Sequence, residues 1–256
     1  MAAGSSAVRY ERSGAAAVLT IDRPERRNAI DGATAQALHA GFRAFAEDEG
    51  ARVLIVTGAG DEAFCAGADL KALETLEGDA PGGPLGFTRL SSPKPTIAAV
   101  SGWCLAGGFE LALWCDLRVA APSARFGFTE RRFGVPLIDG GTQRLPRIVG
   151  LGRALDMILT GRIVEAEEAE RIGLLTQVVR AGGHVERALE IAEALARFPQ
   201  DTMLADRSAA LEGIGLTFEE GMRLEARAAL PTRETAWAGA SRFAGGEGRG
   251  GAGAGV

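Results

Sequence analysis

The sequence has few of the residues that bind metals or form disulfides. Its 256 residues include three cysteines, Cys65, Cys104 and Cys115, and two histidines, His39 and His184. The cysteines are odd in number and lack metal-ligand spacing, and the histidines lie far apart, which argues against a zinc site or a Cys–His nucleophile pair. We therefore expect reduced thiols, a cytoplasmic location and no bound metal.

Lysine and long apolar runs are also scarce. Lys71 and Lys94 are the only lysines, the net charge is −5 and there is no basic block, so we expect no nucleic-acid partner. No apolar run approaches the roughly 20 residues of a membrane span. Residues 1–8 lack the basic-then-apolar order of a signal peptide. The composition therefore predicts a folded protein with no membrane partner.

Up to about residue 180 the chain alternates between strand and helix patterns. Asp31 is placed to cap a helix that ends near Glu47, and Asp69 to begin a second helix. Because strand–helix alternation favours parallel pairing, it predicts an α/β core. Strands are expected at residues 7–11, 15–21, 52–57, 96–100, 117–120 and 174–179.

The rest of the chain has helix patterns only. They cover residues 185–198, 202–211, 218–230 and 232–243. Residues 218–243 cannot form a strong core alone, so we expect them to pack on the core or on a partner chain. Residues 245–256 are mainly glycine and alanine and predict a disordered tail. The chain thus divides into a core at 1–190, a helical region at 191–244 and this tail.

The stretch Ser101–Leu113 joins an apolar strand to a helix through small residues. Gly107 and Gly108 leave unpaired amide N–H groups open to a close approach at the helix start. Such groups, together with the helix dipole, suit an anion or a developing oxyanion. Glu110 lies one turn into the helix among apolar residues, so we expect it to be partly buried with a raised pKa. The simpler alternative is a tight turn followed by a glutamate that the helix dipole favours.

A second turn of small residues, Phe64–Lys71, could expose the amide of Ala68. A convergent pair of N–H groups, from Ala68 and Gly107, is what a thioester oxyanion requires. Taken alone, this segment is more simply a glycine turn followed by Asp69 as a helix cap.

Three further patterns have ordinary explanations when taken alone. Gly58–Ala63 matches a loose dinucleotide-binding pattern, but no helix start follows, and Asp61 and Glu62 would repel a pyrophosphate. Glu130 is most simply a surface carboxylate paired with arginine. Asp139, before two glycines, is most simply a turn residue.

Taken together, the motifs resemble the enoyl-CoA hydratase/isomerase (crotonase) superfamily. They follow in that family's order and at its gaps over roughly residues 8–243. The segments that carry the likeness are Asn28-Ala29-Ile30, Phe64-Cys65-Ala66-Gly67-Ala68-Asp69-Leu70, Ala106-Gly107-Gly108-Phe109-Glu110-Leu111-Ala112, Phe126-Gly127 with Glu130, and Gly140-Gly141-Thr142-Gln143-Arg144-Leu145.

The resemblance implies an α/β fold, a crotonase-like spiral of β-β-α units with a C-terminal helical trimerisation region. Such chains form homotrimers, often paired into homohexamers. The implied substrate is an acyl-CoA thioester, so CoA enters as part of the substrate and no separate cofactor is expected. The thioester oxygen would lie in an oxyanion hole made by the N–H groups of Ala68 and Gly107.

The resemblance also implies how CoA is bound. The family's substrate-binding segment matches Ala66, Asp69, Leu70 and Lys71. Arg23, Arg26 or Arg27 would meet the phosphates of CoA, although a solvated polar turn explains these three arginines equally well.

The likeness is greatest to enoyl-CoA hydratases, lyases of fatty-acid metabolism that use two glutamates, here Glu110 and Glu130. Asp139 stands where hydratases usually have a small residue, and a third carboxylate could favour isomerisation. Arg131 and Arg132, if they faced Glu130, would lower its pKa. The alternatives are a Δ3,Δ2-enoyl-CoA isomerase, in which one glutamate suffices, another crotonase-fold reaction, or a non-catalytic acyl-CoA-binding subunit.

Overall fold

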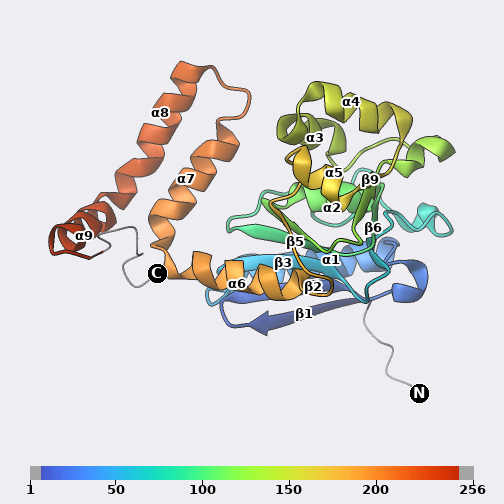
Figure 1. Ribbon diagram of the computed structural model, residues 1–256, viewed down its shortest axis with the longest axis horizontal. Helices are drawn as coiled ribbons and strands as arrows, with labels where there is room; N and C mark the ends of the chain where they lie inside the picture. Colours follow the sequence, from blue (N-terminus) through green and yellow to red (C-terminus); the bar gives the residue numbers. More distant parts are fainter. Residues whose placement is uncertain (1–6, 248–256) are drawn as a thin grey trace. The chain divides into compact units, whose positions relative to one another are not determined.

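The computed structural model describes residues 7–247 (Figure 1). The chain forms two compact units, one up to Ala192 and a second from Glu193 onward. The division falls within helix α6 (His184–Arg197). Among the residues described, none of the helices combines the length and apolar character needed to cross a membrane.

The first unit contains a six-stranded and a four-stranded sheet. The larger sheet has the order β1 (Val8–Ser13), β2 (Ala16–Ile21), β3 (Val53–Gly58), β5 (Thr96–Val100), β7 (Leu117–Ala120) and β10 (Gln177–Val178). The smaller sheet has the order β4 (Ala63–Cys65), β6 (Trp103–Leu105), β8 (Arg125–Gly127) and β9 (Val164–Glu165). Only β1 and β9 pair antiparallel with their neighbours, so the parallel α/β core predicted from strand–helix alternation is confirmed.

From β3 to β8, successive strands alternate between the two sheets. β3 is followed by β4, β5 by β6 and β7 by β8, and in each pair the first strand joins the larger sheet and the second the smaller. This is the β-β-α spiral that the family resemblance implied. The strand after Gly58 also replaces the helix that a dinucleotide-binding turn would require.

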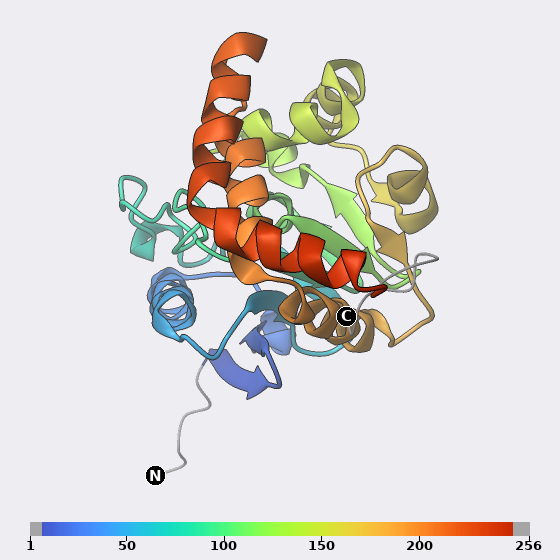
Figure 2. The same cartoon turned by 90° about the vertical axis from the view of Figure 1, so that its left-hand side faces the viewer.

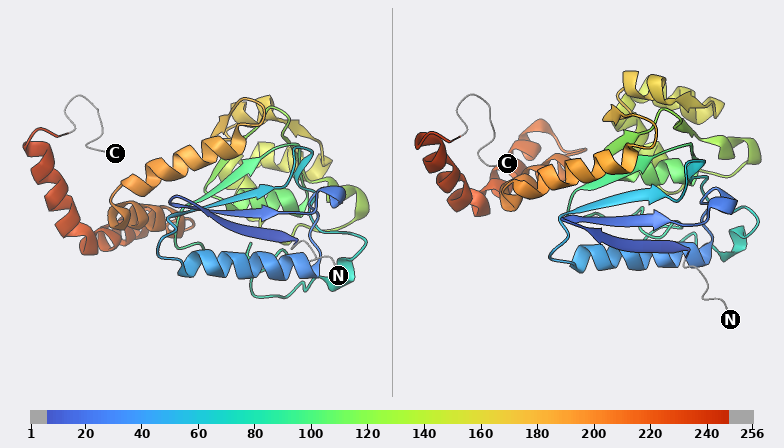
Figure 3. Two further views of the ribbon diagram at one scale, coloured as in Figure 1. Left: turned by 90° about the horizontal axis from the view of Figure 1, so that it is seen from below. Right: turned by 60° about the horizontal axis from the view of Figure 1, so that its bottom comes forward.

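Five α-helices precede α6 in the described part of the first unit. α1 runs along one face of the larger sheet (Figure 3), where its apolar stripe of Leu38, Phe42 and Phe45 is buried. As expected, Asp31 caps this helix and accepts a hydrogen bond from the Thr34 amide at 2.9 Å. The helices are α1 (Gly32–Glu47), α2 (Gly107–Trp114), α3 (Gly141–Val149), α4 (Leu151–Thr160) and α5 (Ala166–Arg171).

The prediction of a helix from Asp69 onward is wrong. Only a single 3₁₀ turn, Leu73–Thr75, forms there. The Asp69 carboxylate is engaged by the Arg23 guanidinium at 3.3 Å, and Leu70 and Leu73 line a cavity instead of packing as one helix face. Because helices are stabilised mainly by burying an apolar face, the local pattern alone does not suffice here.

The second unit consists of α7 (Gln200–Glu212), α8 (Phe218–Ala229) and α9 (Arg233–Ala244), close to the predicted ranges. α7 and α8 lie side by side, and α9 follows α8 after a short turn (Figure 2). Within these three helices, which the structure describes in full, no side chain is buried. Of the tail expected to be disordered, residues 245–247 form a turn, and residues 248–256 lie outside the described part.

Candidate active site

The first unit contains a cavity of about 400 Å³ whose wall is mostly apolar. Leu85, Phe133 and Ile138 belong to that wall. The residues for which the sequence indicated chemistry also reach this cavity: two turn residues, Ala68 and Gly107, and three carboxylic acids, Glu110, Glu130 and Asp139. The structure therefore brings together residues that lie far apart in the chain.

The turn that enters α2 has an unusual backbone. Ala106 adopts φ 51° and ψ −129°, a combination that residues with a side chain rarely adopt and that is often found at functional sites. Its N–H donates to the Gly127 carbonyl oxygen at 2.9 Å, which ties the turn to β8. A Cβ on Gly108 would lie 2.2 Å from the Cys65 carbonyl oxygen, so only glycine allows this helix start to pack so closely on β4.

The second turn is fixed by two hydrogen bonds to Ile30. The Ile30 amide donates to the Gly67 carbonyl oxygen, and the Asp69 amide donates to the Ile30 carbonyl oxygen, both at 2.8 Å. These two bonds flank Ala68. Because successive backbone groups of an extended segment point to opposite sides, the Ala68 N–H is directed away from Ile30.

The two turns touch one another. Gly67 has φ 93°, and a Cβ there would lie 2.9 Å from the Gly107 nitrogen. Within residues 7–247, the N–H groups of Ala68 and Gly107 have no hydrogen-bond partner. Two unpaired amides thus lie at one cavity, which is the arrangement that can stabilise charge on a thioester oxygen.

Glu110 lies on the first turn of α2 and is only 2% exposed. Its Oε1 accepts hydrogen bonds from the Gly141 amide at 2.7 Å and from the Asp139 amide at 3.0 Å. Burial raises its pKa to about 7; the Gly141 amide opposes this, and the neighbouring Asp139 charge adds to it. The carboxyl group can therefore gain or lose a proton near neutral pH.

Glu130 lies on a 3₁₀ turn, Thr129–Phe133, and is 6% exposed. Neither of its carboxyl oxygens has a hydrogen-bond partner among the described residues. Burial raises its pKa to about 7, while the Arg131 charge only partly opposes that rise. Arg131 instead donates to the Ile158 carbonyl oxygen at 3.4 Å. The prediction that Glu130 is a surface carboxylate paired with arginine is therefore wrong.

Asp139 is not the solvent-facing turn residue that the local sequence suggests. It is 3% exposed and lines the cavity. Its Oδ1 accepts a short hydrogen bond from the Thr88 hydroxyl and a longer one from the Leu85 amide at 3.4 Å. Burial raises the pKa of Asp139, and its hydrogen bond to Thr88 opposes that rise. The site thus has three buried carboxyl groups.

A second hollow of about 590 Å³ shares Ala66, Ala68 and Leu70 with the cavity wall and extends to a charged rim, where Glu25, Glu62 and Asp69 accompany the basic residues. The cationic residues around it are Arg26, Arg27 and Lys71. The rim is exposed, and Arg27 pairs with Glu62 at 2.7 Å in a solvent-accessible ion pair. Such pairs are weak, so an incoming anion can compete for the guanidinium.

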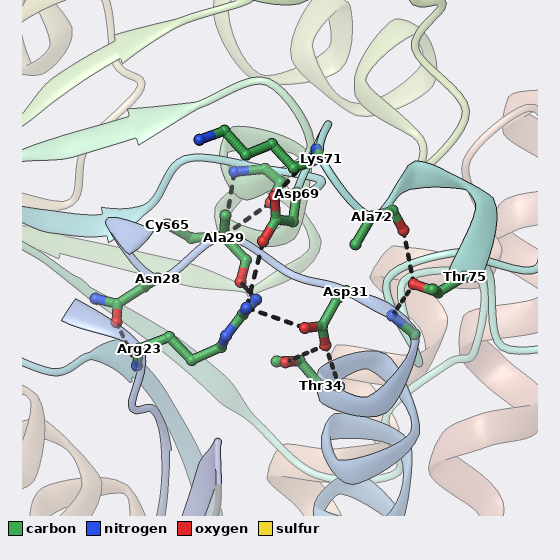
Figure 4. A network of polar contacts seen from close by, with 12 residues as sticks. Arg23, Asn28, Ala29, Asp31, Thr34, Cys65, Asp69, Lys71, Ala72 and Thr75 are labelled. Atoms are coloured by element: carbon green, nitrogen blue, oxygen red, sulfur yellow. Dashed lines mark hydrogen bonds and ion pairs between the residues drawn. The ribbon is translucent and has the colours of Figure 1, made fainter. Parts of the chain in front are cut away.

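Arg23 is not available to an anion in the same way (Figure 4). Its guanidinium lies between Asp31 at 3.0 Å and Asp69 at 3.3 Å and donates to the Ala29 carbonyl oxygen at 2.5 Å. This network joins the segment before α1 to the turn that carries Ala68. Both terminal nitrogens of Arg23 are thus engaged within the protein, so among the three arginines Arg26 and Arg27 are the more accessible to a phosphate.

The chain belongs to the enoyl-CoA hydratase/isomerase family, whose sequence profile matches residues 11–243. It is 39% identical over 223 residues to a probable enoyl-CoA hydratase of Rhizobium meliloti, covering 85% of this chain and 86% of that protein. A crotonyl-CoA hydratase of Syntrophomonas wolfei is 38% identical, with 83% and 84% covered. The crystal structure of an enoyl-CoA hydratase from Mycobacterium marinum superposes with a TM-score of 0.88 at 34% identity, covering 94% and 96%. The crotonase fold that the motifs resembled is thereby confirmed.

Proposed function

We propose that the protein is an enoyl-CoA hydratase, a lyase that adds water across the 2,3 double bond of a trans-2-enoyl-CoA. One observation carries the proposal: two unpaired amides and two buried glutamates, from three separate segments, line the same cavity. Relatives named enoyl-CoA and crotonyl-CoA hydratases support it.

In this proposal the thioester oxygen of the substrate accepts hydrogen bonds from the amides of Ala68 and Gly107. Water adds its oxygen to C3 and passes a proton to ionised Glu110, while protonated Glu130 gives its proton to C2. The charge that develops on the thioester oxygen is stabilised by amides that are already in place. Two carboxyl groups with pKa values near 7 can supply one base and one acid at neutral pH.

We propose that the second hollow, lined by Arg26, Arg27 and Lys71, takes the phosphates of CoA. Arg27 and Lys71 would meet the phosphate charge, while Ala66 and Leu70 border the path from that hollow to the cavity. Asp69 would act indirectly, because its ion pair with Arg23 holds the turn that carries Ala68. CoA is then part of the substrate, and the reaction calls for no separate cofactor.

The test is hydration of crotonyl-CoA, followed by the loss of the enoyl thioester absorbance. We expect turnover by the unmodified protein, and Glu110→Gln and Glu130→Gln should each lower kcat by about 10²–10⁴-fold, since each removes a proton-transfer group. Glu165→Gln, which alters an exposed carboxylate paired with Arg125, is the matched control and should keep full activity. No turnover by the unmodified protein, despite tight acyl-CoA binding, would indicate a non-catalytic binding subunit.

One observation also favours a second candidate, a Δ3,Δ2-enoyl-CoA isomerase. Of the three carboxyl groups at the cavity, only Glu130 has both oxygens without a hydrogen-bond partner among the described residues, and a single such group can move a proton between C2 and C4. Double-bond migration that survives Glu110→Gln but not Glu130→Gln would support isomerisation. Loss of hydration in both variants would support the two-glutamate scheme.

We propose that the protein assembles as a homotrimer or homohexamer in the cytoplasm. The second unit leaves large apolar side chains uncovered, including Phe218 at 86% and Trp237 at 62% exposure. Surfaces of this kind are typical of subunit contacts. The three cysteines are buried thiols, which fits a reducing compartment. Light scattering on the purified full chain tests the assembly, and a monomeric mass would contradict it.

A further inference from the structure

Asp139 is a buried carboxylate at the cavity to which the proposed reaction assigns no step. Asp139 forms hydrogen bonds through both its side chain and its backbone. Through its side chain it accepts hydrogen bonds from the Thr88 hydroxyl and the Leu85 amide. Through its backbone N–H it donates to Glu110 Oε1 at 3.0 Å. Asp139 therefore links Thr88, 51 positions earlier in the chain, to one of the two glutamates.

Arg144 reinforces the same link. Its Nη1 donates to the Asp139 carbonyl oxygen at 2.7 Å, and its Nη2 donates to the Thr88 carbonyl oxygen at 2.5 Å. Gly140, between the two residues whose amides bind Glu110, has φ 104°, and a Cβ there would lie 2.1 Å from Arg144 Nη1. The loop at residues 138–141 thus has one conformation that satisfies both Arg144 and Glu110.

We propose that Asp139 is a positioning residue for Glu110. Its carboxylate ties the loop to Thr88, so that the amides of Asp139 and Gly141 hold Glu110 Oε1 in place, and its negative charge stands beside that glutamate. The inference rests on the proposed function in one respect, namely that Glu110 acts as the base. Asp139 itself need not touch the substrate.

The charges around Glu110 give this arrangement a chemical consequence. Glu110 is faced by Asp139, by Glu130 and by the Arg144 guanidinium. Burial is the largest cause of its raised pKa, and the Asp139 charge raises it further. Burial raises the pKa of Asp139, while Thr88, Arg89 and Arg144 favour its charged form and oppose that rise. Loss of the Asp139 charge would lower the pKa of Glu110 and make it a weaker base.

Asp139→Asn separates charge from geometry, because the amide oxygen of asparagine still accepts from Thr88 and from the Leu85 amide. The measurement is kcat for crotonyl-CoA hydration against pH. As a base, Glu110 must be ionised, so kcat rises with pH through its pKa. In Asp139→Asn we expect this acid limb to move to lower pH by about 1 unit, with a lower maximal kcat.

Thr88→Val provides a second variant that keeps the Asp139 carboxyl group. Removing the hydroxyl that stabilises the charged form raises the pKa of Asp139, so the acid limb should move the same way by a smaller amount. Asp116→Asn is the matched control: Asp116 also accepts from a threonine, Thr96, at 2.8 Å and 3.1 Å, but it does not line the cavity. We expect its acid limb to stay in place.

An acid limb that stays in place in both Asp139→Asn and Thr88→Val would overturn the inference, because a purely structural role would lower activity without moving the limb. A shift in Asp116→Asn as large as in Asp139→Asn would overturn it too. If the unmodified protein hydrates no enoyl-CoA, the proposed function itself fails, and the inference with it. These outcomes are distinguished by the unmodified protein's own profile.

Discussion

The two glutamates of the cavity differ in how their carboxyl groups are hydrogen-bonded. Glu110 lies on helix α2 and accepts hydrogen bonds from two backbone N–H groups. Glu130 lies on a short 3₁₀ turn and has no partner for either oxygen among the described residues. Yet both side chains are buried, and burial raises both pKa values to about 7. The comparison shows that burial is the largest cause of both raised pKa values, whereas the backbone hydrogen bonds fix the orientation of Glu110 alone.

This difference suits the two roles that we propose. A base that activates water must itself have a fixed orientation. The two amides that donate to Glu110 Oε1 give its carboxyl group such an orientation. An acid that delivers a proton needs a group whose oxygens are not already engaged. Each prediction below changes one side of the cavity or its approach and leaves the other intact.

Among the changes that leave both glutamates in the chain, the largest effect is expected from Gly141→Ala, which acts on the Glu110 side. A Cβ at this position would lie 3.0 Å from Glu110 Cγ, from its Oε1 and from Phe128 Cζ, so the glutamate must shift. Because small misplacements of reacting groups are costly, we expect kcat to fall by about 100-fold. Gly152→Ala, where a Cβ meets open space, is the control and should keep full activity. Normal turnover in Gly141→Ala would show that the orientation of Glu110 does not matter.

The next effect concerns Glu130 and the pH dependence of the protein's unfolding free energy. The folded-state pKa of Glu130 is raised from 4.5 to about 7, so its favourable contribution is present below pH 4.5 and is lost as pH rises through 7. For this one group we expect a loss on the order of 2–3 kcal/mol in unfolding free energy between pH 4.5 and 8.

Denaturant unfolding of the unmodified protein and of Glu130→Gln at several pH values measures this contribution. The glutamine variant has no charge to bury, so its unfolding free energy should fall less as pH rises. Glu165→Gln, at an exposed position, should follow the unmodified protein. If Glu130→Gln and the unmodified protein lose stability in parallel, Glu130 titrates as an ordinary surface group.

The smallest effect is expected at the approach to the cavity. Arg27→Ala removes one cation from the exposed rim, and we expect KM for crotonyl-CoA to rise by about two- to fivefold with kcat unchanged. Arg43→Ala breaks a similar exposed pair, with Glu47 at 2.8 Å, away from both hollows that we assign to the substrate, and should leave KM as it was. A KM that does not respond to Arg27→Ala would remove this residue from the CoA site.

Local patterns in the sequence predicted most of the fold. The strands of the larger sheet and the four last helices follow from apolar runs and helical periodicity, which act over a few neighbouring residues. The three-residue strand β6 is too short to show such a pattern, and the sequence did not predict it. The helix expected at Asp69 fails because Leu70 and Leu73 line a cavity, a tertiary effect that no local pattern encodes.

The candidate site could be predicted only in part, for the same reason. The small-residue turns at Ala68 and Gly107 are visible in the sequence, and the resemblance implied that they meet. The sequence pointed to Asp139 as a third carboxylate, but not to its hydrogen bonds, because its side-chain partner, Thr88, lies 51 positions away and its backbone partner, Glu110, lies 29 positions away. Each of these residues has an ordinary local explanation, and only the fold shows that they belong to one network.

A crystal structure with bound butyryl-CoA, which is saturated and cannot be hydrated, tests the central claim most directly. We expect its thioester oxygen to lie within about 2.7–3.2 Å of the amide nitrogens of both Ala68 and Gly107. C3 of the acyl chain should then point between the carboxyl groups of Glu110 and Glu130. A thioester oxygen bound by neither amide, or an acyl chain lying outside this cavity, would contradict the account.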